Sequence, residues 1–214
     1  MISSARSPAL QFQCAPRTEL RQVGPLPRGT VCMEIAMAQK QPLSTALVLI
    51  DVQERLAPAM ADFEACLANQ RLWLEAAPLL GLPVIVTEQY PRGLGPTLPE
   101  LAALTTTPPI AKVTFSCFGT EAFAAAVAPY EELIVIGLEA HVCVLLTVLD
   151  GLARGLRVAV ADDAVTSRSP AHRESGLRAA ARAGAFVAPT ETLLFRQLGS
   201  SAHDGFRAIS RMIR

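Results

Sequence analysis

The stretch ELIVIGLEAHVC (residues 132–143) contains an apolar run, a glycine break and a cysteine. The run before Gly137 predicts a buried strand, and the apolar segment 142–154 predicts a helix. Cys143 therefore falls in the first turn of a helix that follows a strand and a tight bend. Free N–H groups and the helix dipole there favour thiolate, so we expect a depressed pKa and a nucleophilic sulfur. The alternative is a small core residue, because cysteine is often buried.

Lys112 is the second candidate, and the argument for it is compositional. Residues 41–214 contain fourteen lysines and arginines, the nineteen of the whole chain less five in residues 1–40, and Lys112 is their only lysine. A lysine kept in such an arginine-rich chain indicates a site that guanidinium does not fit. A compact ammonium can lie beside a thiol, whereas an arginine is larger and always protonated. The alternative is a surface lysine.

Asp51 is the third candidate, and it directly follows the apolar run TALVLI (residues 45–50). A carboxylate in this position lies at the C-terminal edge of a sheet, where open α/β sheets bind ligands. The alternative is an aspartate that caps a helix or closes a turn.

The rest of the chain alternates short apolar runs with amphipathic segments. This alternation predicts an α/β fold with a parallel sheet and right-handed crossovers. Ser169 and Pro170 are typical of a helix start, and Gly184 is typical of a helix end. The predicted strands are 45–50, 83–87, 110–114, 132–137, 156–161 and 185–188, and the predicted helices are about 61–79, 119–128, 142–154 and 170–183.

All three candidate residues fall near the C-terminal ends of predicted strands. In a doubly wound sheet these ends line one crevice, so Asp51, Lys112 and Cys143 can converge although they are far apart in sequence.

Three motifs carry a resemblance to a known family. The segments LVLIDVQ (47–53), KVTFSCF (112–118) and GLEAHVC (137–143) resemble the active-site motifs of the isochorismatase-like cysteine hydrolase superfamily, in the same order. The resemblance covers about residues 43–198. The segment TEQYPRGLG (87–95) resembles the isochorismatase-domain-containing branch. The resemblance implies a three-layer, Rossmann-like α/β fold with a six-stranded parallel sheet, and a homo-oligomer.

The resemblance also assigns roles to the three candidates. Cys143 would attack an amide carbonyl, Asp51 would carry the proton from the thiol to the leaving amine, and Lys112 would keep both groups charged. A thioester would form and then be hydrolysed by water. The backbone N–H groups of Glu139 and Cys143 would bind the oxyanion, after a cis peptide at Leu138–Glu139. A non-catalytic, partner-binding protein is the alternative function.

The segments in and beside these motifs bear on the substrate pocket and on whether a metal ion binds. The family's zinc-binding members need histidines after the second strand, and residues 87–97 contain none, so we expect no metal and no cofactor. His141, two residues before Cys143, is a less favoured catalytic candidate because the strand-to-helix geometry directs it elsewhere. The candidate pocket residues are Glu88, Gln89, Tyr90, Phe115 and Phe118.

Composition limits the remaining possibilities. A chain of 214 residues with 51% hydrophobic content is long enough for one domain with a full core. No apolar run reaches the roughly 18 residues that span a membrane, and a formal net charge of zero offers no electrostatic footprint for nucleic acid. Five irregularly spaced cysteines favour a reducing compartment, so we expect a cytoplasmic protein.

Residues 1–40 differ from the rest, with five basic and two acidic residues. They contain no hydrophobic segment typical of a secretory signal. We expect an extension preceding a hydrolase domain at 41–214, with Met37 as a natural start of translation. A disordered extension and an organellar transit peptide are the alternatives.

Overall fold

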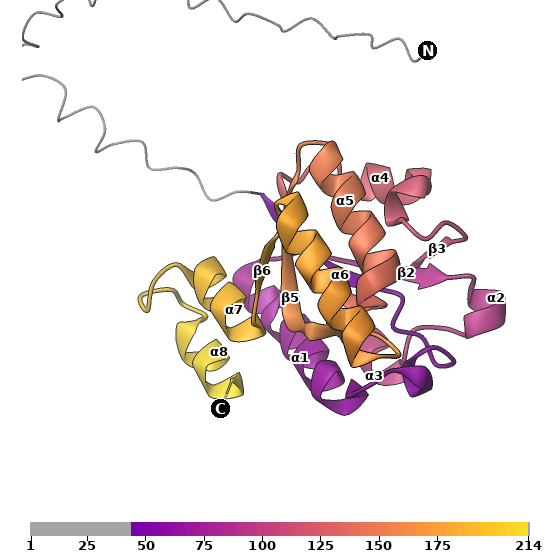
Figure 1. The fold of residues 1–214 in the computed structure, drawn as a ribbon. Coiled ribbons are helices and arrows are strands. Elements are labelled where there is room, and N and C mark those ends of the chain that lie inside the picture. Colours follow the sequence, from indigo (N-terminus) through magenta and orange to yellow (C-terminus); the bar gives the residue numbers. More distant parts are fainter. Residues whose placement is uncertain (1–43, 214) are drawn as a thin grey trace, which may run out of the picture. The chain divides into compact units, whose positions relative to one another are not determined.

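The computed structural model describes residues 44–213, so the predicted extension at 1–40 lies outside the described residues. Its centre is a six-stranded parallel sheet with the strand order β3-β2-β1-β4-β5-β6 (Figure 1). This is the Rossmann-type order, which confirms the predicted fold class. The strands are β1 (Thr45–Ile50), β2 (Val84–Gln89), β3 (Ile110–Lys112), β4 (Glu132–Leu138), β5 (Arg157–Thr166) and β6 (Phe186–Ala188).

All six predicted strands exist, and β1 has the predicted bounds. The largest difference is at β5, which continues to Thr166 instead of ending at 161. Its extra residues pair with β4 after an irregularity in register, through Gly137 with Val165 and Leu138 with Thr166. Residues 162–166, which lie beyond the predicted strand 156–161, are therefore part of the sheet.

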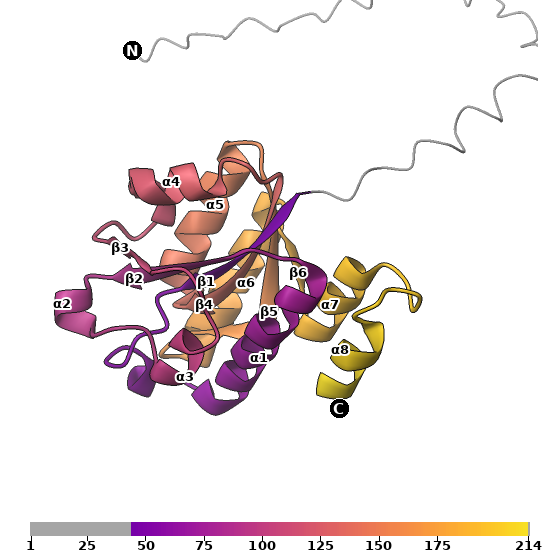
Figure 2. The same ribbon diagram turned by 180° about the vertical axis from the view of Figure 1, so that it is seen from behind.

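Helices cover both faces of the sheet, which gives the three layers (Figures 1 and 2). The first apolar layer contains the fully buried Trp73, and the second contains the fully buried Phe123. Helices α1 (Phe63–Ala76), α3 (Pro99–Ala102), α7 (Thr190–Leu198) and α8 (Phe206–Met212) lie on one face, and α4 (Glu121–Val127), α5 (Leu145–Ala153) and α6 (Pro170–Ala183) lie on the other.

The four predicted helices exist as α1, α4, α5 and α6. The α6 prediction is confirmed at both ends, because Pro170 starts the helix and Gly184 ends it with a left-handed φ of 108°. Four further helices were not predicted from the sequence, namely α7, α8 and the short helices α2 (Pro91–Leu94) and α3. No helix between residues 44 and 213 combines the length and apolarity needed to cross a membrane.

The sheet has its topological switch point between β1 and β4. From this pair the chain builds outward to β3 on one side and to β6 on the other, and the carboxyl ends of the strands at such a point are where open α/β sheets bind ligands. Gly137 makes the close pairing possible, because it has φ of 123° and any Cβ there would collide with the backbone of Ile50. The residues that follow β1 and β4 therefore lie next to each other.

Candidate active site

Asp51 lies at the switch point, directly after β1, and is completely buried. Its φ of 53° is left-handed, a conformation that aspartate tolerates better than most non-glycine residues. The Asp51 N–H donates to the Thr87 carbonyl of β2 at 3.1 Å. The loop after β1 is thus fixed to the neighbouring strand as it leaves the sheet.

Both oxygens of the Asp51 carboxylate are engaged. The Thr87 hydroxyl donates to Oδ1 at 2.8 Å, and the Lys112 ammonium donates to Oδ2 at 2.7 Å. The side chains of Asp51 and Lys112 both have zero exposure, so the ion pair is wholly inside the protein. Burying such a pair is costly unless its remaining hydrogen-bonding capacity is satisfied, and here it is.

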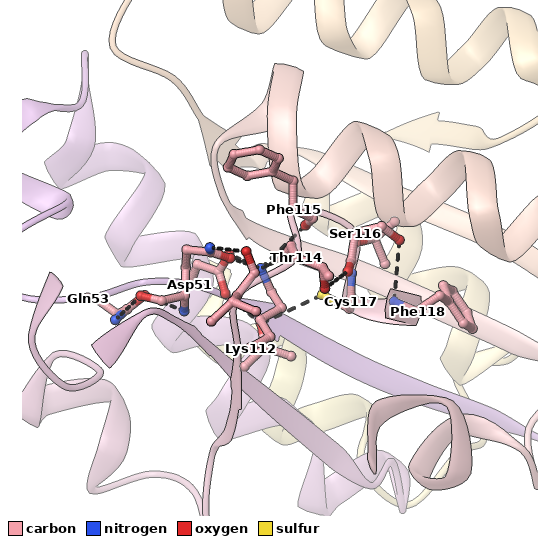
Figure 3. Close-up of polar contacts among 12 residues, drawn as sticks. Asp51, Gln53, Lys112, Thr114, Phe115, Ser116, Cys117 and Phe118 are labelled. Atoms are coloured by element: carbon pink, nitrogen blue, oxygen red, sulfur yellow. Dashed lines mark hydrogen bonds and ion pairs between the residues drawn. The ribbon is translucent and has the colours of Figure 1, made fainter. Parts of the chain in front are cut away.

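Lys112 ends β3 and lies at the centre of this polar cluster (Figure 3). Besides Asp51, its ammonium has three acceptors within hydrogen-bonding distance, which are Gln89 Oε1 at 2.7 Å and the carbonyls of Thr114 and Phe115 at 3.2 and 3.3 Å. An ammonium has three protons, so oxygen acceptors use all of them. Lys112 therefore binds oxygen atoms and acts on the nearby thiols through its charge.

The charge state of Lys112 follows from its surroundings. Burial alone lowers the pKa of Lys112, but attraction to the Asp51 carboxylate, with a hydrogen bond to it, opposes burial, and the pKa is raised. The side chain is consequently a cation at neutral pH.

Cys143 lies in a single π-helical turn, Ala140–Val144, which leads directly into α5. Its thiol is buried, and burial together with the negative charge of Asp51 raises its pKa well above the ordinary value. A hydrogen bond to Asp51 acts in the same direction, and Lys112 opposes it without prevailing. The predicted depressed pKa is therefore wrong. A helix N-terminus favours thiolate, but here burial of Cys143 and the negative charge of Asp51 have the larger effects on its pKa. The nearest cation, Lys112, is already paired with Asp51.

The bend between β4 and the π-helical turn contains the cis peptide Leu138–Glu139, as the resemblance implies. The Glu139 side chain turns to Arg168, whose Nε donates to Glu139 Oε2 at 3.0 Å. Helix α6 packs tightly on this bend through Gly176, where a Cβ would lie 2.6 Å from the Ala140 carbonyl oxygen. Both backbone groups proposed for the oxyanion, at Glu139 and Cys143, lie on this braced segment.

The candidate pocket residues on β2 and its following loop have three different positions. Gln89 belongs to the polar cluster, where it binds Lys112 through Oε1 and the Val113 carbonyl through Nε2. Glu88 instead accepts from the N–H and hydroxyl of Thr97, so it braces the loop. Tyr90 is exposed and lines a hollow of about 600 Å³ beside the edge strand β3, which neither Asp51 nor Cys143 lines.

The two candidate phenylalanines, Phe115 and Phe118, also differ in position. Phe118 is buried and packs edge-to-face on Phe123 at 5.1 Å, so its assignment to the pocket is wrong and it is a core residue. Phe115 is 59% exposed, and its ring points away from the Lys112 ammonium (Figure 3). It lies at the surface next to the cluster, where it could contact a ligand or a partner.

His141 lies away from the proposed reacting atoms. Its Nδ1 is 3.0 Å from the Ser167 hydroxyl, and its ring lies 4.7 Å from that of His172. These contacts agree with the expectation that the His141 side chain points away from Cys143.

Three further residues belong to the cluster, and two of them, Thr87 and Gln53, were not candidates from the sequence. Thr87 binds Asp51, Cys117 lies within 3.8 Å of the Thr87 hydroxyl, and Gln53 accepts from the Gln89 N–H at 2.8 Å. Thr87 had one available signal, since it is a polar residue at the end of an otherwise apolar strand beside the strand that ends at Asp51. Among residues 44–213, no group of three or more His, Cys, Asp or Glu side chains is arranged to hold a metal ion.

Comparison with known proteins agrees with this architecture. The isochorismatase domain family matches residues 45–192. Isochorismatase domain-containing protein 2A of Mus musculus is 36% identical over 174 residues, which cover 81% of this chain and 84% of the mouse protein. A solved MAR1 ribonuclease from Caenorhabditis elegans is 36% identical with a TM-score of 0.76, over 80% of this chain and 90% of that one.

Two bacterial structures add information on chemistry and assembly. YcaC from Escherichia coli, an octameric hydrolase of unknown specificity, is 25% identical with a TM-score of 0.75, over 79% of this chain and 86% of that one. YcaC from Pseudomonas aeruginosa, solved with covalent acrylamide, is 26% identical with a TM-score of 0.75, over 79% and 88% of the two chains. The chain belongs to the isochorismatase domain family, in the branch of isochorismatase domain-containing proteins.

Proposed function

We propose that this member of the isochorismatase domain family is a cysteine hydrolase that cleaves the C–N bond of a small amide-like substrate through a thioester. The observation that carries the proposal is the fully buried Asp51–Lys112 ion pair, whose carboxylate is also electrostatically coupled to Cys143. A buried base beside a thiol is an arrangement that activates a nucleophile.

In the first half of the reaction, the Cys143 sulfur attacks the carbonyl carbon while its proton passes to Asp51. Because the pKa of Cys143 is raised, the thiol keeps its proton until this step, and Asp51 acts as a general base during the attack. The oxyanion accepts hydrogen bonds from the N–H groups of Glu139 and Cys143. Asp51 then returns the proton to the leaving nitrogen, the C–N bond breaks, and an amine and a thioester remain.

In the second half, a water molecule attacks the thioester and gives a proton to Asp51. The C–S bond breaks, the carboxylic acid leaves, and Asp51 returns the proton to the Cys143 sulfur. Lys112 remains a cation throughout and holds the Asp51 carboxylate in place through its hydrogen bond to Oδ2. No step needs a metal or a cofactor.

Labelling with a small amide electrophile tests the activated thiol directly. Acrylamide is the natural probe, because the Pseudomonas aeruginosa relative was solved with acrylamide bound covalently. We expect intact-mass and peptide analysis at neutral pH to find Cys143 labelled much faster than Cys66 and Cys117. The Asp51→Asn protein should lose this preference. Equal, slow labelling of all cysteines would favour a non-catalytic, partner-binding protein instead.

A screen of small amides and ureido acids for ammonia release would identify the substrate class. Wild-type protein should release ammonia from at least one compound, and the Cys143→Ala protein should release none. Release that persists in Cys143→Ala would contradict the thioester route.

Cleavage of RNA is a second candidate, favoured by the description of the Caenorhabditis elegans relative as a ribonuclease. The neutral net charge and complete burial of the Asp51 and Lys112 side chains favour a small substrate over a polyanion. A labelled RNA oligonucleotide incubated with wild-type and Cys143→Ala protein decides between them. Cleavage by wild-type protein alone would replace the amide proposal.

Assembly and location complete the proposal. A homo-oligomer is supported by the octameric Escherichia coli relative and by exposed leucines, Leu146 and Leu149, on one side of α5. Light scattering of the purified protein tests it, and a monomer at micromolar concentration would contradict it. A cytoplasmic location is proposed because the thiol must stay reduced. Fractionation of cells expressing the full chain would instead find an organelle if residues 1–40 are a transit peptide.

A further inference from the structure

Thr87 makes two contacts with Asp51, although no motif argument selected it. Its carbonyl accepts from the Asp51 N–H at 3.1 Å, and its hydroxyl donates to Asp51 Oδ1 at 2.8 Å. Thr87 is fully buried within β2, and the residue it pairs with on β1 is Ile50, the last residue of that strand. Backbone and side chain of one residue thus hold both the left-handed backbone and the carboxylate of Asp51.

The contact with Cys117 determines to which atom the Thr87 hydroxyl donates its proton. The Cys117 sulfur lies 3.8 Å from Thr87 Oγ1 with the thiol as donor, and Figure 3 shows this contact as the dashed line from the sulfur. A threonine hydroxyl has one proton, so an oxygen that accepts from the thiol is free to donate only to Asp51. Burial raises the pKa of Cys117 to about 11, so the thiol keeps the proton it donates at neutral pH.

The carboxylate is therefore held from two sides, by Thr87 at Oδ1 and by Lys112 at Oδ2. A carboxylate held at both oxygens cannot rotate, so the direction in which it receives a proton is fixed. Among the described residues, the titratable groups coupled to Asp51 are Lys112, Cys117 and Cys143.

We propose that Thr87 is a positioning residue that orients Asp51 to take the proton of Cys143, with Cys117 fixing the direction of the Thr87 hydroxyl. This inference rests on the proposed cysteine hydrolase function. Loss of the hydroxyl leaves a buried carboxylate with one donor fewer. Such a carboxylate is free to turn and binds a proton more tightly, because hydrogen bonds to the charged form stabilise it.

The test compares Thr87→Val, which keeps the shape and removes the hydroxyl, with Thr87→Ser, which keeps the hydroxyl. The readout is the second-order rate of Cys143 alkylation by acrylamide from about pH 5 to about pH 9, a range that brackets neutral pH. In Thr87→Val we expect a rate about tenfold lower near neutral pH, the usual effect of losing a hydrogen bond to a charged group. The fall in rate on the acid side of its pH profile, here called the acid limb, should also move to higher pH. Thr87→Ser should follow the wild-type profile.

Cys117 supplies a second, independent comparison. Cys117→Ala removes the donor to Thr87 and should move the acid limb in the same direction by a smaller amount. Cys117→Ser keeps a donor and should leave the limb nearer its wild-type position. A melting curve for each variant shows whether it is folded. If Thr87→Val does not fold, Thr87→Ala also lacks the hydroxyl, with less bulk, and should give the same shift.

The inference is overturned if Thr87→Val or Thr87→Ala has the wild-type profile, or if Thr87→Ser is as slow as Thr87→Val. The second result would mean that packing, not the hydroxyl, is required. Failure of the proposed function gives a different result, in which wild-type Cys143 shows no preference for acrylamide and Asp51→Asn changes nothing. The two failures are therefore distinguishable without a known substrate.

Discussion

Two buried carboxylates lie at opposite ends of the same sheet, and they differ in what surrounds them. At the carboxyl ends of the strands, Asp51 is paired with Lys112, and both side chains are completely buried. At the amino ends, Glu132 starts β4 and is paired with Arg196 from α7. Glu132 is nearly as buried as Asp51, but 34% of the Arg196 side chain is exposed.

The partners of the two carboxylates explain the difference in chemistry. Glu132 has further contacts with Thr45 and Gln197, and Arg196 also lies 5.2 Å from the Phe186 ring. This pair joins the start of β4 to α7, and within residues 44–213 no cysteine thiol contacts it. Asp51 has a thiol coupled to it and a cation that fits a small space. A buried ion pair alone therefore does not mark a reactive site, whereas a buried pair with an adjacent thiol does.

The largest effect expected from this comparison comes from the carboxyl ends. Cys143→Ala and Asp51→Asn should each lower kcat/KM at least about 10⁴-fold, and the double variant should lose little more, because the residues act as one unit. Turnover of the substrate found in the ammonia screen measures this. Strictly additive losses would mean that the roles are wrongly assigned.

Glu132→Gln is the matched control at the amino ends. It should leave kcat/KM of the folded protein unchanged and lower the free energy of unfolding by about 1 kcal/mol, because it removes an ion pair whose arginine stays partly exposed to solvent. A large loss of activity in Glu132→Gln would remove the distinction between the two ends.

The second prediction compares the two cations of these ion pairs, Lys112 and Arg196. Lys112→Arg keeps the charge, but a planar guanidinium does not fit among the four oxygen acceptors within 2.7 to 3.3 Å of the ammonium. We expect a folded protein whose kcat/KM falls about a hundredfold, the cost of a displacement of roughly 1 Å at a reacting site.

The reciprocal swap, Arg196→Lys, should leave activity unchanged and lower the melting temperature slightly. Near wild-type activity in Lys112→Arg would reduce Lys112 to a structural charge and leave the proposal resting on Asp51 and Cys143.

A third effect concerns the bend after β4. In Gly176→Ala, the added Cβ would lie 2.6 Å from the Ala140 carbonyl oxygen and 2.8 Å from the His141 Cα, both of which are backbone atoms. Real Cβ atoms do not approach backbone atoms this closely, so the bend or α6 must shift, and we expect kcat/KM to fall about tenfold. Kinetics and a melting curve measure the two consequences separately. Ser175→Ala, at the exposed neighbouring position, is the control and should change neither; an unaffected kcat/KM in Gly176→Ala would show that the bend tolerates displacement.

The sequence was sufficient for the strands and for the approach of Asp51, Lys112 and Cys143 to one crevice, because strand ends are local and sheet topology is limited. It was insufficient for the charge state of Cys143. The helix-terminus rule is local, whereas burial and the Asp51 charge come from other elements. The assignment of Phe118 to the pocket was wrong for the same reason, since its core partner Phe123 lies on the next helix. Thr87 was missed because its role exists only through the pairing of β2 with β1.

The smallest effect concerns His141, which lies at the carboxyl ends two residues before Cys143 and could be mistaken for a catalytic partner. Its Nδ1 contacts Ser167. We therefore expect His141→Asn to label with acrylamide within about threefold of the wild-type rate, as expected for a residue outside the proton transfer. A loss comparable to that of Asp51→Asn would give His141 a catalytic role and break the comparison.

The same variant should alter the pH dependence of stability. Burial lowers the pKa of His141, the charges of His172 and Arg168 act in the same direction, and Glu139 opposes them. The unfolded chain, with a histidine pKa of about 6.5, therefore binds a proton that the folded protein resists. The resulting stability is complete above about pH 6.5 and is lost as pH falls through the lower folded pKa. Melting temperatures at about pH 7 and about pH 5 should converge more closely in His141→Asn than in wild type, by a small amount because the ring is only partly buried. Ser167→Ala keeps the histidine and should retain the wild-type difference between the two pH values, and equal differences in all three proteins would show that His141 does not contribute to acid sensitivity.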